Sequence, residues 1–339
     1  MTKPTLYNEK DFVDILQYIQ TSRNQVFVRI NTALIDLYWQ IGKMISHKVH
    51  TAAWGKGVVR ALAAYIDQQA PHLKGFSDKN LWRMKQFFET YQNDENLSPL
   101  VRKLPWTHNT IIFSRCKSME ERAYYLNLCI KERYSSRALD RQISASYFER
   151  TVLGNEKLSA VLRELHPEIN NTLKDHYVLE FLGLPKQHHE RHLQAALVEH
   201  MKQFILELGQ DFIFVGDEYR LQVGNQDFFV DLLFFHRELS ALVAFELKIG
   251  KFMPEHLGQL NFYLEALDRD VKKPHENPSI GVLLCRDKDE EVVEYALSRN
   301  LSPTMVAQYE LKLPDKKLIQ AKLHELTETV RLGATDDQL

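Results

Sequence analysis

The sequence of 339 residues contains little cysteine and no long apolar run. Its three cysteines form no CxxC pair, which argues against a disulfide scaffold or a thiolate zinc site and predicts small buried side chains at Cys116, Cys129 and Cys285. No stretch approaches the roughly 20 apolar residues that a membrane helix needs, and residues 1–10 lack the apolar segment of a signal peptide. We therefore expect a cytoplasmic protein that does not act at a membrane.

An excess of charge of one sign is also missing from the chain as a whole, whose formal net charge is −2. The two halves differ, however, because residues 1–150 carry a net charge of +8 and residues 151–339 carry −10. This division predicts two domains, of which the basic one suits a polyanion and the acidic one supplies carboxylates. A solvated basic surface without a partner is the alternative interpretation of the first half.

Apolar residues of the first half recur at helical spacing from Phe12 to about Arg150, which predicts an all-helical domain over residues 1–150. Ser77 is typical of the residue that caps a helix, here one beginning at Asp78. A helix ending near Gln69, a turn with proline and glycine, and this second helix match the outline of a helix-turn-helix. Its basic and amide side chains predict DNA contacts, with a solvated helical bundle as the alternative; the candidate residues are Lys56, Lys79, Arg83 and Gln86.

The pattern changes in the second half, where strands join the helices. After a predicted helical connector over residues 151–187, a helix over 190–208 is followed by strand-like runs over 212–223, 226–236 and 241–248. Short connections between these runs predict an antiparallel meander. Another helix (254–267), a strand (279–285), a helix (289–299) and a short strand (305–309) complete an αβββαβ order. We expect an α+β protein with a mixed-sheet domain over 188–330 and a frayed tail over 331–339.

Charged side chains border the most apolar strands of the chain. Glu246 and Lys248 project from one face of a strand because residues two apart do so, and the preceding hairpin can bring Asp231 beside them. Buried charges are costly unless they are paired or bind a metal. One interpretation is a salt bridge at the rim of the sheet. The other is a divalent-metal site, in which two carboxylates and the Leu247 carbonyl offer the oxygen ligands that Mg²⁺ prefers, and Lys248 orients or deprotonates a water that attacks a phosphodiester.

Asp231 followed by Glu246-Leu247-Lys248, within this order of elements, resembles the PD-(D/E)XK nuclease signature. The surrounding sequence is similar to the YhcG-type family of these nucleases; the matching stretches are Phe228 to His236, Phe245 to Gly250, Gly258 to Tyr263, Trp54 to Gly57, Gly75 to Ser77, Asn80 to Met84 and Leu104 to Trp106. This resemblance covers nearly the whole chain and implies a restriction-endonuclease-like fold after a helical domain. Val230 stands where the name of the motif has proline, a position that supplies no ligand.

The resemblance also implies roles for individual residues. Asp231 and Glu246 would be metal ligands and Lys248 the catalytic lysine, with Mg²⁺ as the cofactor, which Mn²⁺ can replace. Gln259 and Tyr263 are similar to the QxxxY element of RecB-like nucleases and would lie on one helical face near the scissile phosphate. Their alternative is a surface amide and a packing tyrosine.

A further acid often comes from the first core helix of such nucleases. Glu199 is therefore a candidate metal ligand, and Glu218 on the first strand is its competitor. Either side chain could instead be simply solvated.

These features together predict a metal-dependent nuclease that hydrolyses DNA phosphodiester bonds in restriction, defence or DNA processing, with endonuclease and exonuclease action both open. The alternative is a nucleic-acid-binding or assembly subunit that keeps the nuclease fold as a scaffold. The complete set of Asp, Glu, Lys and Gln argues against it, because a scaffold has no reason to keep costly converging charges. The helical domain over 1–150 is expected to bind DNA or to organise a dimer, and cutting both strands with one site per chain would be simplest for a homodimer. A protein partner and the choice between DNA and RNA stay open.

Overall fold

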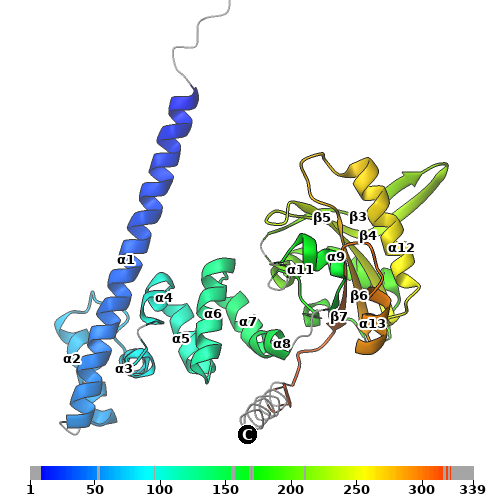
Figure 1. Ribbon diagram of the computed structural model, residues 1–339. Coiled ribbons are helices and arrows are strands. Elements are labelled where there is room, and N and C mark those ends of the chain that lie inside the picture. Colours follow the sequence, from blue (N-terminus) through cyan, green and yellow to red (C-terminus); the bar gives the residue numbers. More distant parts are fainter. Residues whose placement is uncertain are drawn as a thin grey trace, which may run out of the picture. The chain divides into compact units, whose positions relative to one another are not determined.

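The computed structural model describes residues 9–315 except 52–53, 95, 154–156, 168, 170–171, 186 and 210, together with residues 318, 319 and 321. The chain divides into two compact units between Asp140 and Arg141 (Figure 1). The predicted first domain, 1–150, thus ends inside the second unit, and the predicted tail over 331–339 lies outside the described residues. Within the described part, no helix is both long and apolar enough to cross a membrane.

Helices alone form the described part of the first unit, as its apolar spacing predicts. Its core is aromatic: the Trp106 ring packs edge-on against Tyr38 and Phe87, with ring centroids 4.8 and 5.3 Å apart. Cys116 and Cys129 are buried, as predicted. The helices are α1 (Glu9–Thr51), α2 (Lys56–Gln69), α3 (Asp78–Tyr91), α4 (Ser98–Lys103), α5 (Trp106–Arg115), α6 (Met119–Glu132) and α7 (Ser136–Ser144), which continues into the second unit.

The second helix of the predicted helix-turn-helix is α3. It begins at the predicted cap, where the Ser77 hydroxyl accepts a hydrogen bond from the Asn80 backbone N–H at 3.4 Å. Its apolar face, formed by Leu81, Met84 and Phe87, is buried. Its polar face is exposed at all three predicted positions, Lys79, Arg83 and Gln86, and Lys56 at the start of α2 is exposed as well. Contact of this face with DNA stays a prediction.

The second unit is built on a mixed sheet, which within the described residues has seven strands in the order β1-β7-β6-β5-β4-β3, with β2 paired to β7 off this path. β3, β4 and β5 form the predicted antiparallel meander, whereas β6 is parallel to β5 and β7 to β6. The strands are β1 (Lys157–Leu158), β2 (His176–Val178), β3 (Phe212–Val223), β4 (Gln226–His236), β5 (Ala241–Lys251), β6 (Ile280–Asp287) and β7 (Thr304–Glu310).

Helices cover both faces of this sheet (Figure 1). Alternation along β5 sends Phe245 and Leu247 into one core, with α10 and α11, and Leu242 and Ala244 into the other, with α12 and α13. The αβββαβ order is therefore confirmed. The helical elements are α8 (Tyr147–Leu153), α9 (Ala160–Leu165), a 3₁₀ turn (Glu180–Leu182), α10 (Glu190–Glu199), α11 (Met201–Leu208), α12 (His256–Ala266), a π-helical turn (Leu267–Val271) and α13 (Glu290–Leu297).

Two segments differ from their predicted structure. The predicted helical connector, 151–187, contributes strands β1 and β2, both paired with β7. Strands of two and three residues are too short to show an alternating pattern in a sequence. The predicted helix over 190–208 is interrupted at His200, whose backbone (φ −102°, ψ 28°) leaves helical geometry. Helical spacing continues across this break because α10 and α11 pack against the same core.

A buried ionic network holds the start of the second unit together. The Glu207 side chain of α11 is fully buried, with carboxylate oxygens 2.7 Å from Arg141 Nη1 and 3.7 Å from Arg150 Nη2. Lys174 lies 3.8 Å away, and the Val178 backbone N–H donates a hydrogen bond of 3.1 Å. Burial alone would raise the pKa of Glu207, but the three cations lower it to about 2. This carboxylate therefore links Arg141, α8 and β2 to α11 within the second unit.

Alanine at Gly42 should destabilise the first unit. A Cβ at this position of α1 would run into the Met84 carbonyl oxygen of α3, and the added atom cannot be avoided by a side-chain rotation because the obstacle is backbone. We expect a loss of about 2 kcal/mol or more in the free energy of unfolding. Gly57→Ala in α2 is the matched control, because its Cβ would find no heavy atom within 4 Å. Urea unfolding of the full chain measures both; equal stability of the two variants would contradict the close α1–α3 packing.

Candidate functional site

Strands β4 and β5 separate at Asp231 and Glu246. Their antiparallel pairing ends at Leu232 and Phe245, and beyond this point β4 stays with β3 while β5 stays with β6 (Figure 1). Asp231 bridges the opening, because its Oδ2 accepts a hydrogen bond from the Leu247 backbone N–H at 2.8 Å. A side-chain carboxylate of one strand thus takes the place of the next carbonyl in the ladder. We call this point the fork.

Glu246 and Lys248 project together from β5 beside the fork, as the sequence predicts. The Lys248 ammonium donates a hydrogen bond to Glu246 Oε1 at 2.9 Å. Glu246 is only 2% exposed, and its second oxygen, Oε2, has no hydrogen-bond partner within the described part of the chain. Lys248 also lies 3.6 Å from the Glu190 carboxylate at the start of α10. One lysine therefore contacts two acids, and one buried carboxylate oxygen is left unsatisfied.

The pKa values of this cluster reflect burial next to like charge. Burial and the neighbouring Asp231 raise the pKa of Glu246 to about 7, against the opposing effect of Lys248. Burial also raises the pKa of Asp231, although the Leu247 N–H and Lys248 favour its ionised form. Burial alone would lower the pKa of Lys248, but Glu246 and the other acids raise it. The lysine is thus held as a cation, while its two strand carboxylates resist being charged together.

Helix α12 adds polar groups on the same side of the sheet. The Gln259 side-chain N–H donates to the Tyr263 hydroxyl at 2.7 Å, which brings together the two residues predicted to act as a pair. Burial raises the pKa of Tyr263, its hydrogen bond from Gln259 opposes this, and Glu246 and Asp231 add to the increase. The hydroxyl therefore lies within electrostatic range of the fork. His256, which the sequence did not single out, has its pKa lowered by burial and by Lys248.

The acid that the structure brings to Lys248 is Glu190, and sequence reasoning missed it. Glu199, the predicted candidate, is exposed at the opposite end of α10, roughly 14 Å along the helix axis at 1.5 Å per residue. An acid in the first turn of a helix is common, because it interacts favourably with the helix dipole. Nothing in the sequence around Glu190 therefore distinguished it as a functional residue. Glu218, the competitor, lies between the paired positions Asp217 and Tyr219 of β3, across from Asp231.

The donor atoms at the fork fit a divalent cation held through oxygen. Glu246 offers a buried oxygen without a partner, Asp231 offers a second carboxylate, and the Leu247 carbonyl lies on the same strand. Among the described residues, no three His, Cys, Asp or Glu side chains are grouped to hold a metal. The site would therefore rely on two carboxylates completed by backbone and water oxygens, which suits a hard cation.

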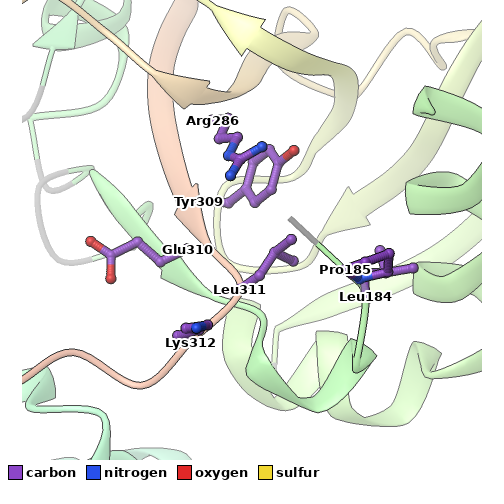
Figure 2. Close-up of a pocket in the computed structure, with 7 residues that line it drawn as sticks. All are labelled: Leu184, Pro185, Arg286, Tyr309, Glu310, Leu311 and Lys312. Atoms are coloured by element: carbon purple, nitrogen blue, oxygen red, sulfur yellow. The ribbon is translucent and has the colours of Figure 1, made fainter. Parts of the chain in front are cut away.

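A pocket of about 500 Å³ opens at the ends of β6 and β7, separate from the fork residues (Figure 2). Tyr309 packs in the core that contains Leu247, whereas Glu246 and Lys248 alternate to the opposite face of β5. The pocket is lined by Leu184, Pro185, Arg286, Tyr309, Glu310, Leu311 and Lys312.

Replacing Glu246 by glutamine should stabilise the metal-free protein at high pH. A folded-state pKa of about 7, above the ordinary 4.5, supplies stability that is complete below the ordinary value and is lost as pH rises through 7. Glutamine does not ionise, so E246Q should gain up to about 3 kcal/mol relative to wild type between about pH 4.5 and pH 8. Urea unfolding with a chelator measures this. The exposed Glu255→Gln is the control, and a pH-independent difference for E246Q would contradict the assignment.

Both halves of the chain match known protein-domain families. Residues 170–324 match the YhcG PDDEXK nuclease domain, and residues 14–150 match the DUF1016 N-terminal domain. The Escherichia coli (strain K12) protein described as "Putative nuclease YhcG" is 31% identical over 346 residues, covering 91% of this chain and 92% of that protein. A crystal structure of a repair endonuclease from Pyrococcus abyssi has a TM-score of 0.26 and 14% identity, over 36% of this chain and 49% of that one.

The two domain matches follow each other along the chain in the order helical domain, then nuclease domain, and the nuclease match contains the fork and α12. The curated relative matches this chain over nearly the whole length of both. The chain belongs to the YhcG family of PD-(D/E)XK nucleases.

Proposed function

We propose that this protein is a Mg²⁺-dependent nuclease that hydrolyses DNA phosphodiester bonds. The observation that carries the proposal is the buried Glu246 at the fork, where Lys248 satisfies one carboxylate oxygen and the other has no partner among the described residues. Burying this group beside Asp231 is costly unless a cation joins the two carboxylates. Mg²⁺ prefers oxygen ligands and suits this donor set, and Mn²⁺ can replace it.

Asp231, Glu246 and the Leu247 carbonyl would hold the cation. Bound Mg²⁺ would polarise a phosphate oxygen and lower the pKa of a bound water. Lys248 has a raised pKa and stays an ammonium group, which can donate hydrogen bonds to the attacking water or to a phosphate oxygen. In the hydrolysis, the water oxygen would bond to phosphorus as the bond to the leaving oxygen breaks; the proton lost by the water would pass to solvent, and the leaving oxygen would take up a proton from solvent to become a hydroxyl.

The pair on α12 would orient the phosphate. The Tyr263 oxygen accepts the Gln259 N–H, so the Tyr263 O–H can donate to another acceptor. Gln259 is exposed and keeps a second amide hydrogen for the same purpose. Both groups lie on the side of the sheet to which Glu246 and Lys248 project.

The first unit would contribute DNA affinity. Its candidate residues, Lys56, Lys79, Arg83 and Gln86, are all exposed. Lysine and arginine side chains that contact backbone phosphates make binding salt-dependent without reading sequence. A preference for DNA over RNA is tested by including both nucleic acids among the cleavage substrates.

Cleavage should depend on Mg²⁺ and on the fork residues. We expect Asp231→Asn and Lys248→Ala to lower the rate at least about a hundredfold, since each removes a group that acts on the reacting phosphate. The assay follows purified full chain on linear, nicked, branched and single-stranded DNA and on RNA, with Mg²⁺, Mn²⁺ or chelator. Lys251→Ala is the matched control, because this exposed lysine of the same strand pairs with Asp289 at 3.6 Å, away from the fork.

Two results would overturn the proposal. Cleavage that persists in Asp231→Asn would remove the fork from the mechanism. A wild-type protein that binds DNA with strong salt dependence but cuts none of these substrates would favour the alternative, a nucleic-acid-binding or assembly subunit with a nuclease scaffold.

Glu190, rather than Glu199, is proposed as the further acid of the site. Its carboxylate lies 3.6 Å from Lys248 and would keep the ammonium group in position. We expect Glu190→Gln to slow cleavage about tenfold and to raise the Mg²⁺ concentration needed for half-maximal rate, because the cluster loses negative charge. Glu199→Gln should leave both quantities within about twofold. Equal effects of the two variants would exclude a specific role for Glu190.

A further inference from the structure

One face of α1 is apolar and uncovered. The residues on it recur at intervals of three, four or seven, so that they occupy the first and fourth positions of successive heptads. Each of the larger ones is 46–67% exposed, although α1 belongs to a folded unit. We call this face the heptad stripe; its members are Leu16, Ile19, Val26, Ile30, Ala33, Leu37 and Met44.

The stripe is distinct from the face with which α1 packs in its own unit. Ile35, Tyr38 and Ile45 are buried, the last two in a core with Leu81 and Met84 of α3. α1 extends well past the other helices of this unit (Figure 1). One apolar face of α1 is therefore covered by the chain itself, whereas the other is exposed to solvent. A seven-residue repeat of this kind is typical of a helix that pairs with another helix.

The stripe is complementary to itself when two copies run in opposite directions. With the helices centred between Ile30 and Ala33, those two residues face each other across the pair, and Val26 meets Leu37. The next layer pairs Arg23 with Gln40 and is polar, and the layer after it pairs Ile19 with Met44, so apolar layers lie on both sides of one polar layer. Such a two-fold contact is closed, because the same surface is used by both partners. The stripe from position 16 to 44 is roughly 42 Å long, at 1.5 Å per residue.

Charge favours the same orientation. Arg29 and Asp36 lie seven residues apart, on the same edge of the stripe. The antiparallel register places Arg29 of one copy beside Asp36 of the other, and symmetry repeats this pair. Asp36 is partly exposed and uses Oδ1 for Arg102, at 2.6 Å. A parallel register would instead place these charges beside Leu34 and Ile41. We infer that the heptad stripe binds the stripe of a second copy of this chain as an antiparallel coiled coil. This inference does not depend on the proposed cleavage activity.

Cysteine cross-linking of the full chain tests the partner and its direction. The native cysteines are buried, so single cysteines introduced by Val26→Cys and Leu37→Cys are the exposed ones. Under mild oxidation, a mixture of the two variants should form the mixed disulfide, while each variant alone should not, because equivalent positions would be roughly 16 Å apart along the axis. Cross-linking of V26C to itself would establish a parallel pair and overturn the inferred orientation.

Sedimentation measures the association itself. Ile30→Glu places two carboxylates next to the centre of the seam and should raise the dimer dissociation constant at least about a hundredfold. Val28→Glu is the matched control, since Val28 is equally exposed on α1 but lies off the stripe, and it should leave association unchanged. Wild-type protein that is monomeric at every concentration, or equal dissociation by both variants, would overturn the inference.

Discussion

The hydrogen bond from the Leu247 N–H to the Asp231 carboxylate holds the point at which β4 leaves β5. Where a sheet opens, a buried backbone donor loses its partner, at a cost of about 1–3 kcal/mol if nothing replaces it. Here the departing strand supplies the replacement from a side chain. The bond also fixes Asp231 next to Glu246, so the same interaction that ends the ladder brings two carboxylates together. The site thus follows from where pairing stops and needs no dedicated loop.

The electrostatics of the fork are a consequence of that geometry. Glu246 is buried, and a second acid beside it makes its ionised form unfavourable near neutral pH. Lys248 compensates only in part, because it contacts one oxygen and is shared with Glu190. A folded protein normally pairs such a group. The unsatisfied oxygen of Glu246 is therefore the feature of the fork on which the proposed cation site rests.

The two units differ in how they cover their apolar surfaces. The sheet domain buries both faces of its central strands and secures its first elements around Glu207, whose carboxylate meets Arg141, Arg150 and Lys174. The helical unit relies on an aromatic core and on the close approach of α1 to α3 at Gly42. It leaves the heptad stripe of α1 outside that core. The sheet domain thus covers the apolar faces of its central strands within the chain, whereas the helical unit leaves an apolar face of α1 exposed.

Local sequence was sufficient to predict the hairpins of β3, β4 and β5 and the charged motif that they carry. The bounds of β3 and β4 agree with the alternating pattern, and Asp231, Glu246 and Lys248 could be brought together because one short hairpin joins their strands. It was insufficient for Glu190, 41 residues before Asp231, which reaches Lys248 only through the packing of α10. Strands β1 and β2, of two and three residues, could not be predicted from local sequence either. Alternating patterns and turn residues report on neighbours in the chain. The position of Glu190 beside Lys248 and the pairing of β1 and β2 with β7 depend instead on which distant segments pack together.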